Sequence, residues 1–459
     1  MKIVIVGGGT AGWISALFLL KSQPGVHRVT VIESSKIGII GAGEGSTGLM
    51  WDLLQNRWFD TGIDIKDFID SVDGTIKLGI RHKNWTGDGS SYYAPLDGSQ
   101  TSQQNPDTDF LHVLSEYGIE KMHVASDIGR HFEAHQVPNY CALHFDGHKI
   151  GKYFKDHLVG DNLELIDAVV DNIVISDLDG NIDSIVLDNG ETIKADLYID
   201  STGFSRLFSK KLNVKWKSYS EYLPVNRAMP FLLSYEEDEV TEPVTTAHAL
   251  SSGWMWDIPL QNRRGCGYVY DKNCISDEMA QREIELYLGK KIKPIKFIDF
   301  DSGRSEVLWE KNCIFLGLSA AFAEPLEATS IHTTIIQMLV LCFEFLGKTP
   351  EETFIDSSVS RYNERMTKMY DDIRDFLIVH YQGGRTDSEF WRNFIEKDMV
   401  TSFTKEVLEK AKTKVPGVFQ FDYYFGSVGA PLWNWVLAGL GKITPELARK
   451  EMELYGYKK

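Results

Sequence analysis

The sequence predicts an α/β fold in which a Rossmann-like nucleotide-binding unit is joined to a second, mainly helical unit. An apolar strand, a glycine-rich turn, a helix and a second apolar strand follow one another within residues 1–35. Two later apolar strands, near 200 and 317, also end in turns that contain glycine. After residue 320, apolar residues recur with helical spacing.

The first 35 residues divide into KIVIVG as a strand, GGTAGW as a turn, ISALFLLKS as a helix and RVTVIE as a strand. The polar, glycine- and serine-rich segment 84–107 predicts a long loop or lid. Residues 163–205 predict short hairpin strands with turns at DLDGN and DNGE, followed by the buried strand DLYIDSTG. Helices are expected at 329–347, roughly 358–380 and 389–412.

These elements suggest two units. We expect a discontinuous nucleotide-binding domain within 1–345, formed by about 1–50, 140–210 and 295–345. Substrate or lid segments would be inserted at 51–139 and 211–294. A mainly helical domain over 346–459 would cover the substrate.

Composition excludes several classes of function. Of the 459 residues, 65 are acidic and 48 basic, and a net charge of −17 would repel nucleic acids and anionic membrane surfaces. The five cysteines are scattered without a C-x-x-C pair, so no metal site or disulfide framework is expected. The run IIQMLVLCFEFLG is too short for a membrane span, and MKIVIVGGG already reads as a strand of the fold. A cytoplasmic protein is expected.

Gly7, Gly9 and Gly12 form the pattern G-x-G-x-x-G between an apolar strand and a helix, and Glu33 closes the next strand. In this fingerprint the first glycine allows a tight turn, the second admits the pyrophosphate, and the third lets helix and strand pack closely. Thr10 and Ala11 lie at the helix start, whose free N–H groups attract phosphates. Glu33 can accept hydrogen bonds from ribose hydroxyls. The pattern predicts a bound dinucleotide.

Downstream strand ends favour FAD over NAD. ADLYIDSTGFSRLF (195–208) places Asp200 and Gly203 after an apolar strand, and NCIFLGLSAAFAEPLEATS (312–330) places Gly317 and Leu318 after another. A chain that returns to the nucleotide at three separated strand ends resembles the large family of FAD hydroxylases, reductases and halogenases. This resemblance implies a glutathione reductase-type FAD domain.

The string GWMWDIP (253–259) resembles the W-x-W-x-I-P signature of flavin-dependent halogenases. Trp254, Trp256 and Ile258 would share one face of a strand that ends at Pro259, so two indoles could form a rigid wall. Taken alone, two spaced tryptophans more often fill a core. With 11 tryptophans and 12% aromatic residues, the chain has ample material for a flat-ring site. GAGEGST (41–47), with Gly43, resembles the family's strap beside the flavin.

The segment DGTIKLGIRHKNW (73–85) resembles the family stretch that carries the catalytic lysine, which falls on Lys77. We expect one strand here, with Lys77 and Arg81 on one face. In EPLEATS, the resemblance assigns Glu327 to the active-site glutamate and the amides of Thr329 and Ser330 to halide binding. The family's usual string is E-S-T-G, so Ser330 replaces a glycine. If that position needs positive φ, the strain is on the order of 1–2 kcal/mol, and halide preference stays open.

The resemblance covers about residues 1–400 and weakens towards the C-terminus. FDYYFGSVGAPLWNWVLAGLG (421–441) keeps Tyr423, Tyr424, Trp433 and Trp435 but has no acid beyond Asp422, whereas in tryptophan halogenases a glutamate of this part helps to clamp free tryptophan. The sequence therefore favours another aromatic small molecule, of the indole, phenol or pyrrole class, over free tryptophan.

The resemblance implies that hypohalous acid forms from reduced FAD, dioxygen and a halide ion, which is chloride, bromide or iodide. Lys77 would then capture this acid as a haloamine or activate it by hydrogen bonding. Glu327 would activate the halogen or accept the ring proton. No second nucleotide fingerprint appears, so a separate NAD(P)H-dependent flavin reductase is expected. The alternatives are an FAD-dependent aromatic monooxygenase and a non-redox FAD-binding protein. The sequence leaves native substrate, regiochemistry and oligomeric state open, a homo-oligomer included.

Overall fold

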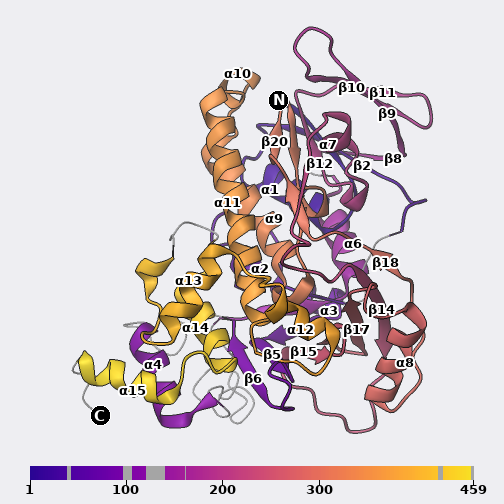
Figure 1. The fold of residues 1–459 in the computed structure, drawn as a ribbon. Coiled ribbons are helices and arrows are strands. Elements are labelled where there is room, and N and C mark those ends of the chain that lie inside the picture. The colour runs from indigo at the N-terminus through magenta and orange to yellow at the C-terminus, as the bar shows by residue number, and fades with distance from the viewer. Residues whose placement is uncertain (39–42, 97–105, 120–139, 161, 422–426, 456–459) are drawn as a thin grey trace.

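The computed structural model spans residues 1–459 and describes all of them except 39–42, 97–105, 120–139, 161, 422–426 and 456–459 (Figure 1). Within the described part, helices and strands alternate as an α/β protein requires, so the predicted fold class is confirmed. No helix in this part is both long enough and apolar enough to cross a membrane.

A six-stranded sheet carries the predicted fingerprint. Its strand order is β20-β21-β12-β1-β2-β8, and all neighbours are parallel except β20 and β21. The central strands are almost fully buried, which explains their unbroken apolar runs. The strands come from three distant stretches of chain: β1 (Lys2–Val6), β2 (Arg28–Glu33), β8 (Leu163–Asp167), β12 (Leu197–Asp200), β20 (Trp309–Glu310) and β21 (Cys313–Phe315).

Helix α1 (Thr10–Lys21) makes the crossover between β1 and β2 and is buried over nearly its whole length. It packs between α6 (Gly147–Leu158) and α9 (Thr329–Val340), so apolar side chains surround it. The strand–turn–helix–strand order predicted for residues 1–35 is confirmed.

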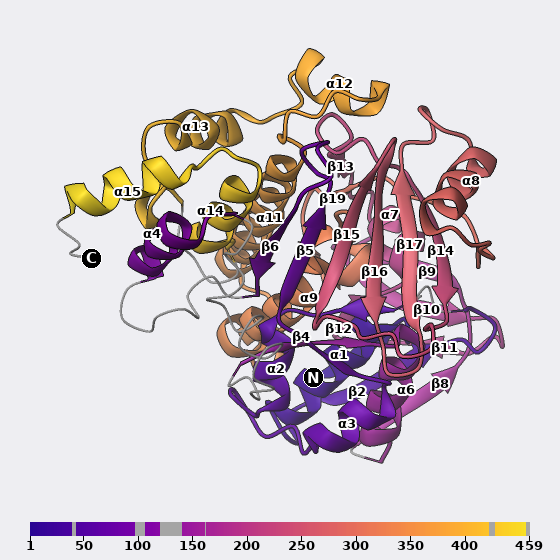
Figure 2. The same ribbon diagram turned by 90° about the horizontal axis from the view of Figure 1, so that it is seen from below.

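A second, seven-stranded sheet of order β18-β14-β17-β16-β15-β5-β6 stands beside the first (Figure 2). Helix α8 (Asp277–Leu288) lies beside the β17 and β14 side of this sheet (Figure 2). The strands are β5 (Gly79–Lys83), β6 (Ser91–Pro95), β14 (Arg227–Leu233), β15 (Val244–Leu250), β16 (Gly253–Pro259), β17 (Arg264–Tyr270) and β18 (Ile298–Asp299).

Three small sheets complete the strands. They are β11-β10-β9, β13-β19-β22 and β3-β7-β4. The hairpins predicted within 163–205 are confirmed by β9 and β10. The bounds are β3 (Glu44–Gly45), β4 (Thr75–Lys77), β7 (Ala142–Phe145), β9 (Val170–Ile175), β10 (Ile182–Leu187), β11 (Thr192–Ile193), β13 (Trp216–Ser218), β19 (Gly303–Ser305) and β22 (Ala321–Phe322).

The single strand expected around Lys77 is wrong. β4 ends at Lys77 and pairs with β7, whereas β5 begins at Gly79 and pairs with β6 and β15. The chain changes sheets at Leu78, whose N–H donates to Pro243 O (2.7 Å). Lys77 therefore lies where two sheets meet.

The long loop predicted over 84–107 is also partly wrong, because Ser91–Pro95 forms the edge strand β6. Its pairing with β5 satisfies backbone groups that a loop would leave to water. Residues 97–105 of that segment lie outside the described part.

Helices dominate after residue 320, as predicted. A short 3₁₀ turn, η4 (Pro325–Glu327), precedes α9, and α9 continues into a π-helical turn, η5 (Leu341–Phe345). The helix expected over 389–412 is two helices, because Asp398 adopts φ 51° and Thr401 caps a new helix. The remaining helices are α2 (Gly48–Leu54), α3 (Ile65–Ser71), α4 (Pro106–Tyr117), α7 (Leu207–Lys211), α10 (Pro350–Thr353), α11 (Asp356–His380), α12 (Glu389–Glu396), α13 (Ser402–Ala411), α14 (Ala430–Gly439) and α15 (Pro445–Leu454).

Candidate active site

The glycine turn after β1 is packed tightly against the turn after β12. Gly7 has φ +118°, and a Cβ added there would lie 2.2 Å from the carbonyl oxygen of Ser201. A Cβ at Gly12 would lie 2.0 Å from the carbonyl oxygen of Gly7. Ser201 Oγ donates to the carbonyls of Val6 (2.9 Å) and Gly7 (3.0 Å). Gly7 and Gly12 thus have the turn and packing roles that the fingerprint gives them.

The turn after β21 packs against the start of α1, beside the glycine turn after β1. Gly317 has φ +58°, and a Cβ there would lie 2.7 Å from Ala11 Cβ at the start of α1. Asp200 is fully buried and accepts hydrogen bonds from Thr202 N and Oγ1, Phe208 N and Ser319 Oγ. Its carboxylate holds the β12 and β21 turns together, so any contribution to cofactor binding is through these turns. Leu318 is half-buried in the same turn.

Other parts of this edge are open. A Cβ at Gly9 or at Gly203 would meet no described residue within 4 Å. Gly9 is the N-cap of α1, with no side-chain cap, so the first-turn N–H groups beside Thr10 are available to a ligand. A tight glycine cradle beside an open helix N-terminus fits a dinucleotide such as FAD.

Glu33, at the end of β2, is partly engaged within the protein. Its carboxylate accepts a hydrogen bond from Trp13 Nε1 (3.3 Å) and forms an ion pair with Lys155. A carboxylate has about four acceptor sites, so Glu33 keeps capacity for a ribose hydroxyl. Gly43 lies elsewhere, against the Cα of Gly265 in the seven-stranded sheet.

Gly9→Ala and Gly12→Ala are expected to behave differently. Gly9 has extended backbone and open space, so alanine should leave thermal unfolding unchanged, but a methyl group facing the pyrophosphate should raise the Kd for FAD several-fold, through lost hydrogen bonds of about 1 kcal/mol each. Gly12→Ala forces a backbone shift and should destabilise the fold by about 1–3 kcal/mol. Differential scanning fluorimetry and FAD titration separate the two. Unchanged FAD affinity in Gly9→Ala would argue against pyrophosphate at this turn.

Lys77 is enclosed by protein. It is 1% exposed, and Nζ donates to the carbonyl oxygen of Ser46 (3.0 Å). A Cβ at Gly45 would lie 3.2 Å from Lys77 Nζ and 3.7 Å from Ala328 Cβ, so the absence of a side chain at Gly45 leaves room between the amine and the EPLEATS turn. Burial lowers the pKa of Lys77 to about 8, although the charge of Glu327 opposes this shift. A fraction of the amine is therefore neutral and nucleophilic near neutral pH.

The EPLEATS turn presents Thr329 and Ser330 as the first residues of α9, which has no side-chain cap. Their backbone N–H groups lie at a helix N-terminus, where an anion is stabilised. The residue with positive φ is Ala328 (φ 54°, ψ 38°), whereas Ser330 is helical. The concern that Ser330 strains the turn is thus wrong, because the left-handed position is two residues earlier.

Glycine substitutions should have opposite effects at these two positions. Ala328→Gly removes a left-handed alanine that costs about 1–2 kcal/mol, which exceeds the extra chain entropy of glycine, about 0.4–1 kcal/mol. Ser330→Gly loosens a helical position and should cost about 0.5–1 kcal/mol. Denaturant midpoints should rise for the first variant and fall for the second. Equal shifts would contradict this assignment of strain.

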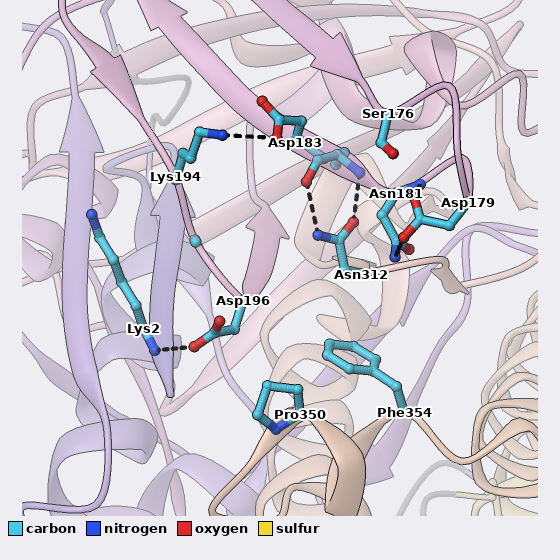
Figure 3. Close-up of a pocket in the computed structure, with 12 residues that line it drawn as sticks. Lys2, Ser176, Asp179, Asn181, Asp183, Lys194, Asp196, Asn312, Pro350 and Phe354 are labelled. Atoms are coloured by element: carbon cyan, nitrogen blue, oxygen red, sulfur yellow. Dashed lines mark hydrogen bonds and ion pairs between the residues drawn. The ribbon is translucent and has the colours of Figure 1, made fainter.

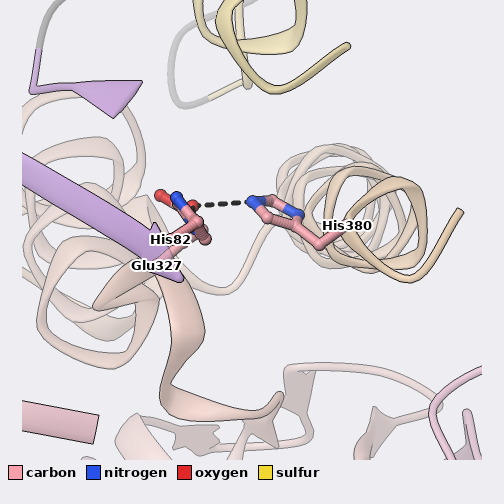
Figure 4. A group of neighbouring side chains, drawn as sticks. All are labelled: His82, Glu327 and His380. Carbon is pink, nitrogen blue, oxygen red and sulfur yellow. Dashed lines mark hydrogen bonds and ion pairs between the residues drawn. The ribbon is translucent and has the colours of Figure 1, made fainter. Parts of the chain in front are cut away.

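Glu327, His82 and His380 form a compact cluster although they come from η4, β5 and α11 (Figure 4). Glu327 Oε1 lies 2.8 Å from His380 Nε2, with which it forms a hydrogen bond, and 3.4 Å from His82 Nε2. Burial lowers the pKa of His82 to about 4, and neither of its ring nitrogens has a hydrogen-bond partner among the described residues. The three donor atoms lie within 4.8 Å of one another. Two donors on one tetrahedral ion would be roughly 3.4 Å apart, so the 2.8 Å contact is a hydrogen bond.

The strand β16 contributes an aromatic wall. Trp254 is buried and Trp256 half-buried, and their rings pack edge to face at 6.5 Å. Trp254 Nε1 donates to Glu324 Oε2 (2.9 Å), and the Tyr381 hydroxyl donates to the same oxygen. Burial raises the pKa of Glu324 to about 7. Ile258 is also buried, and Pro259 accepts a hydrogen bond from Thr75 Oγ1 (2.6 Å).

The C-terminal ring residues are only partly described. Trp433 is fully buried, packs on Phe376 (5.5 Å between ring centroids) and has no partner for its indole N–H within the described part of the chain. Phe376 in turn contacts His380 (5.0 Å). Tyr423 and Tyr424 lie outside the described residues.

A depression at the other end of the six-stranded sheet is unrelated to this cluster (Figure 3). It surrounds the amino end of β1, where Lys2 N donates to Asp196 (2.7 Å), while Lys194 pairs with Asp183 (2.9 Å). Its polar groups are largely hydrogen-bonded or ion-paired with one another. Open parallel sheets bind ligands at the carboxyl ends of their strands, whereas this depression lies at the amino end of β1, so it is not the candidate active site.

Sequence reasoning assigned no role to His82, His380 or Glu324. His82 and Glu324 lie within the segments already singled out for Lys77 and Glu327. His380 follows Phe376 by one helical turn on the apolar face of α11. A titratable residue on a buried apolar face is a signal of a functional site, and this signal could have identified His380.

Comparisons with known proteins agree with this arrangement. The family model "Tryptophan halogenase" matches residues 2–453. The chain is 31% identical to 7-chloro-L-tryptophan 6-halogenase KtzR of Kutzneria sp. (strain 744), over 97% of this chain and 92% of that protein. It is 30% identical to tryptophan 7-halogenase RebH of Lentzea aerocolonigenes, over 97% and 91%. The solved tryptophan halogenase of Shewanella frigidimarina superposes with a TM-score of 0.86 at 26% identity, over 99% of this chain and 93% of that chain.

The matched residues include every segment from the dinucleotide fingerprint to α14. The chain therefore belongs to the tryptophan halogenase family, whose members are flavin-dependent halogenases that use FADH2 and a halide ion.

Proposed function

We propose that the protein halogenates the indole ring of tryptophan or a tryptophan-like compound, with Lys77 delivering the halogen. The observation that carries this proposal is the enclosure of the Lys77 amine beside the EPLEATS turn. A solvated lysine would lose hypohalous acid to water, whereas a buried one can hold it.

The expectation that free tryptophan is not the substrate finds no support among the relatives, because KtzR and RebH are both named for tryptophan substrates. The sequence argument rested on the lack of an acid other than Asp422 in this segment, and residues 422–426 are outside the described residues. Free L-tryptophan is therefore the first substrate to test.

In the proposed site, FAD is held by the glycine cradle and by Thr10, Ala11, Glu33, Gly203, Gly317 and Leu318. The backbone N–H groups of Thr329 and Ser330 hold the halide. When bound in its reduced form, FAD supplies the electrons with which dioxygen is activated to convert halide to hypohalous acid. Lys77 then binds that acid, and Glu327 assists transfer to the ring.

Family members need a separate flavin reductase. We propose the same for this chain, with an NAD(P)H-dependent enzyme as the partner. The purified protein alone should then not oxidise NADPH, and halogenation driven by NADPH should require an added reductase.

The test is mass spectrometry of products formed with bromide, FAD and a flavin reductase, using free L-tryptophan, a tryptophan-containing peptide, indole, a phenol and a pyrrole. Bromine on an indole ring supports the proposal. Added oxygen would point to the aromatic monooxygenase alternative, which no comparison supports. Bromination of the phenol or pyrrole alone would refute the substrate assignment but keep the halogenase.

A further inference from the structure

His380 contacts two oxygen atoms, one with each ring nitrogen. Nδ1 lies 2.9 Å from the carbonyl oxygen of Phe376, and Nε2 lies 2.8 Å from Glu327 Oε1. A carbonyl oxygen only accepts, so Nδ1 carries a hydrogen, and a neutral ring would present a lone pair at Nε2. A lone pair and a carboxylate oxygen repel at this distance. The His380–Glu327 pair must therefore hold one proton between its two members.

The surroundings favour an imidazolium–carboxylate pair. Burial alone would raise the pKa of Glu327, but the hydrogen bond with His380 and the nearby imidazole of His82 outweigh burial and hold that pKa well below its usual value. Glu327 is thus a carboxylate at rest, and the shared proton resides on His380.

Titratable groups from the elements packed around the His380–Glu327 pair lie close to it. They include the carboxyl of Glu324, the amine of Lys77 on β4 and the imidazole of His82 on β5. Among the described residues, the hydroxyls of Tyr92 on β6 and of Tyr381, the C-cap of α11, also lie nearby.

Only Glu327 reaches open space. Its side chain is 12% exposed, whereas that of His380 is fully buried. Among the described residues, the hydrogen bond that Glu327 makes uses Oε1, so Oε2 is the atom that can face a substrate. His380 can therefore act on the reaction only through Glu327.

We propose that His380 is a positioning residue that stores a proton for Glu327, so that the pair gives this proton to the oxygen of hypohalous acid and later takes up the ring proton. This inference rests on the proposed function. It assigns the proton that the leaving oxygen takes up to the His380–Glu327 pair rather than to Lys77.

The step balances without another reactant. The ring carbon supplies the electron pair of the new carbon–halogen bond, and the halogen–oxygen bond breaks with its pair remaining on oxygen. His380 gives the stored proton to Glu327 Oε1, the carboxyl group turns about its Cγ–Cδ bond to bring that proton to the leaving oxygen, and the oxygen departs as water. The ring then loses its proton to Glu327, which returns it to His380, so ArH + HOX gives ArX + H2O. The electrophilic halogen is reduced as the ring carbon is oxidised.

The inference predicts a specific pH dependence. The stored proton is present at low pH and is lost as pH rises, so ring bromination should fall on the alkaline side in the wild-type enzyme. In His380→Gln, the amide can still donate to Glu327 but cannot ionise. Bromination should drop by about 10²-fold or more, and the alkaline fall should disappear. Hypobromous acid trapped in solution should increase, because its formation does not need His380.

Several comparisons make the test decisive. His380→Ala should regain activity with added imidazole, in proportion to the imidazolium fraction. In a Glu327→Gln background, His380→Gln should cause no further loss, because the two residues act as one unit. His157→Gln, which changes a histidine on α6 away from this cluster, should keep the wild-type pH profile.

A His380→Gln enzyme with the wild-type rate and pH profile would overturn the inference, since hydrogen bonding alone would then suffice. Additive losses in the double variant would overturn it as well. If the wild-type enzyme brominates no ring at all, the proposed function fails and this role fails with it. An active wild type with an unaffected glutamine variant removes only the role of His380.

Discussion

Lys77→Ala is expected to lower ring halogenation by about 10²–10⁴-fold, the range typical for loss of a positioned acid–base group. The amine is buried beside the EPLEATS turn, so no solvent group can replace it. Oxidation of FADH2 and release of hydrogen peroxide should continue, because the dinucleotide edge does not contain Lys77. Product chromatography and a peroxide assay on the same sample measure the two quantities.

Two further variants serve as controls for Lys77→Ala. Lys77→Met keeps most of the buried volume without the amine and should be as inactive as Lys77→Ala, which separates chemistry from a packing defect. Lys83→Ala removes another lysine of the same segment, on β5, and should remain active. Halogenation by Lys77→Ala at the wild-type rate would remove Lys77 from the mechanism.

Glu327→Gln is expected to cause the second largest loss, about 10²–10³-fold in ring halogenation. Glutamine keeps the shape of the side chain but removes the charge that pairs with His380 and that opposes the lowering of the Lys77 pKa. Lys77 should therefore titrate at lower pH in this variant, as chemical labelling of the amine across pH would reveal. This second readout does not depend on halogenation.

Glu327→Asp and Glu306→Gln serve as controls. Aspartate keeps the charge but is one methylene shorter, so partial activity is expected. Glu306 is exposed, and its substitution should have no effect. Full activity of Glu327→Gln, together with an unchanged titration of Lys77, would rule out the proposed role of the carboxylate.

Much of the fold was predictable from the sequence, because it depends on local patterns. The run Lys2–Val6, the glycine spacing from Gly7 to Gly12 and the acid at Glu33 specify a strand, a turn, a helix and a strand that hardly depend on distant contacts. The same holds for the hairpins after residue 163. Predictions failed where tertiary pairing overrode local preference, as at Leu78, where the chain changes sheets, and at Ser91–Pro95, where a polar segment becomes an edge strand.

The sequence by itself determined the fold class, the dinucleotide edge, and the choice of Lys77 and Glu327 as the residues to examine. Only the tertiary structure decided that Lys77 is buried, that Ala328 rather than Ser330 is left-handed, and that Glu327 forms a hydrogen bond with His380. The reason is the distance along the chain: His380 is 53 residues from Glu327, and Lys77 donates to a carbonyl 31 residues away. Local sequence periodicity does not indicate such distant partners, whereas the burial of Lys77 and the hydrogen bond of Glu327 depend on them.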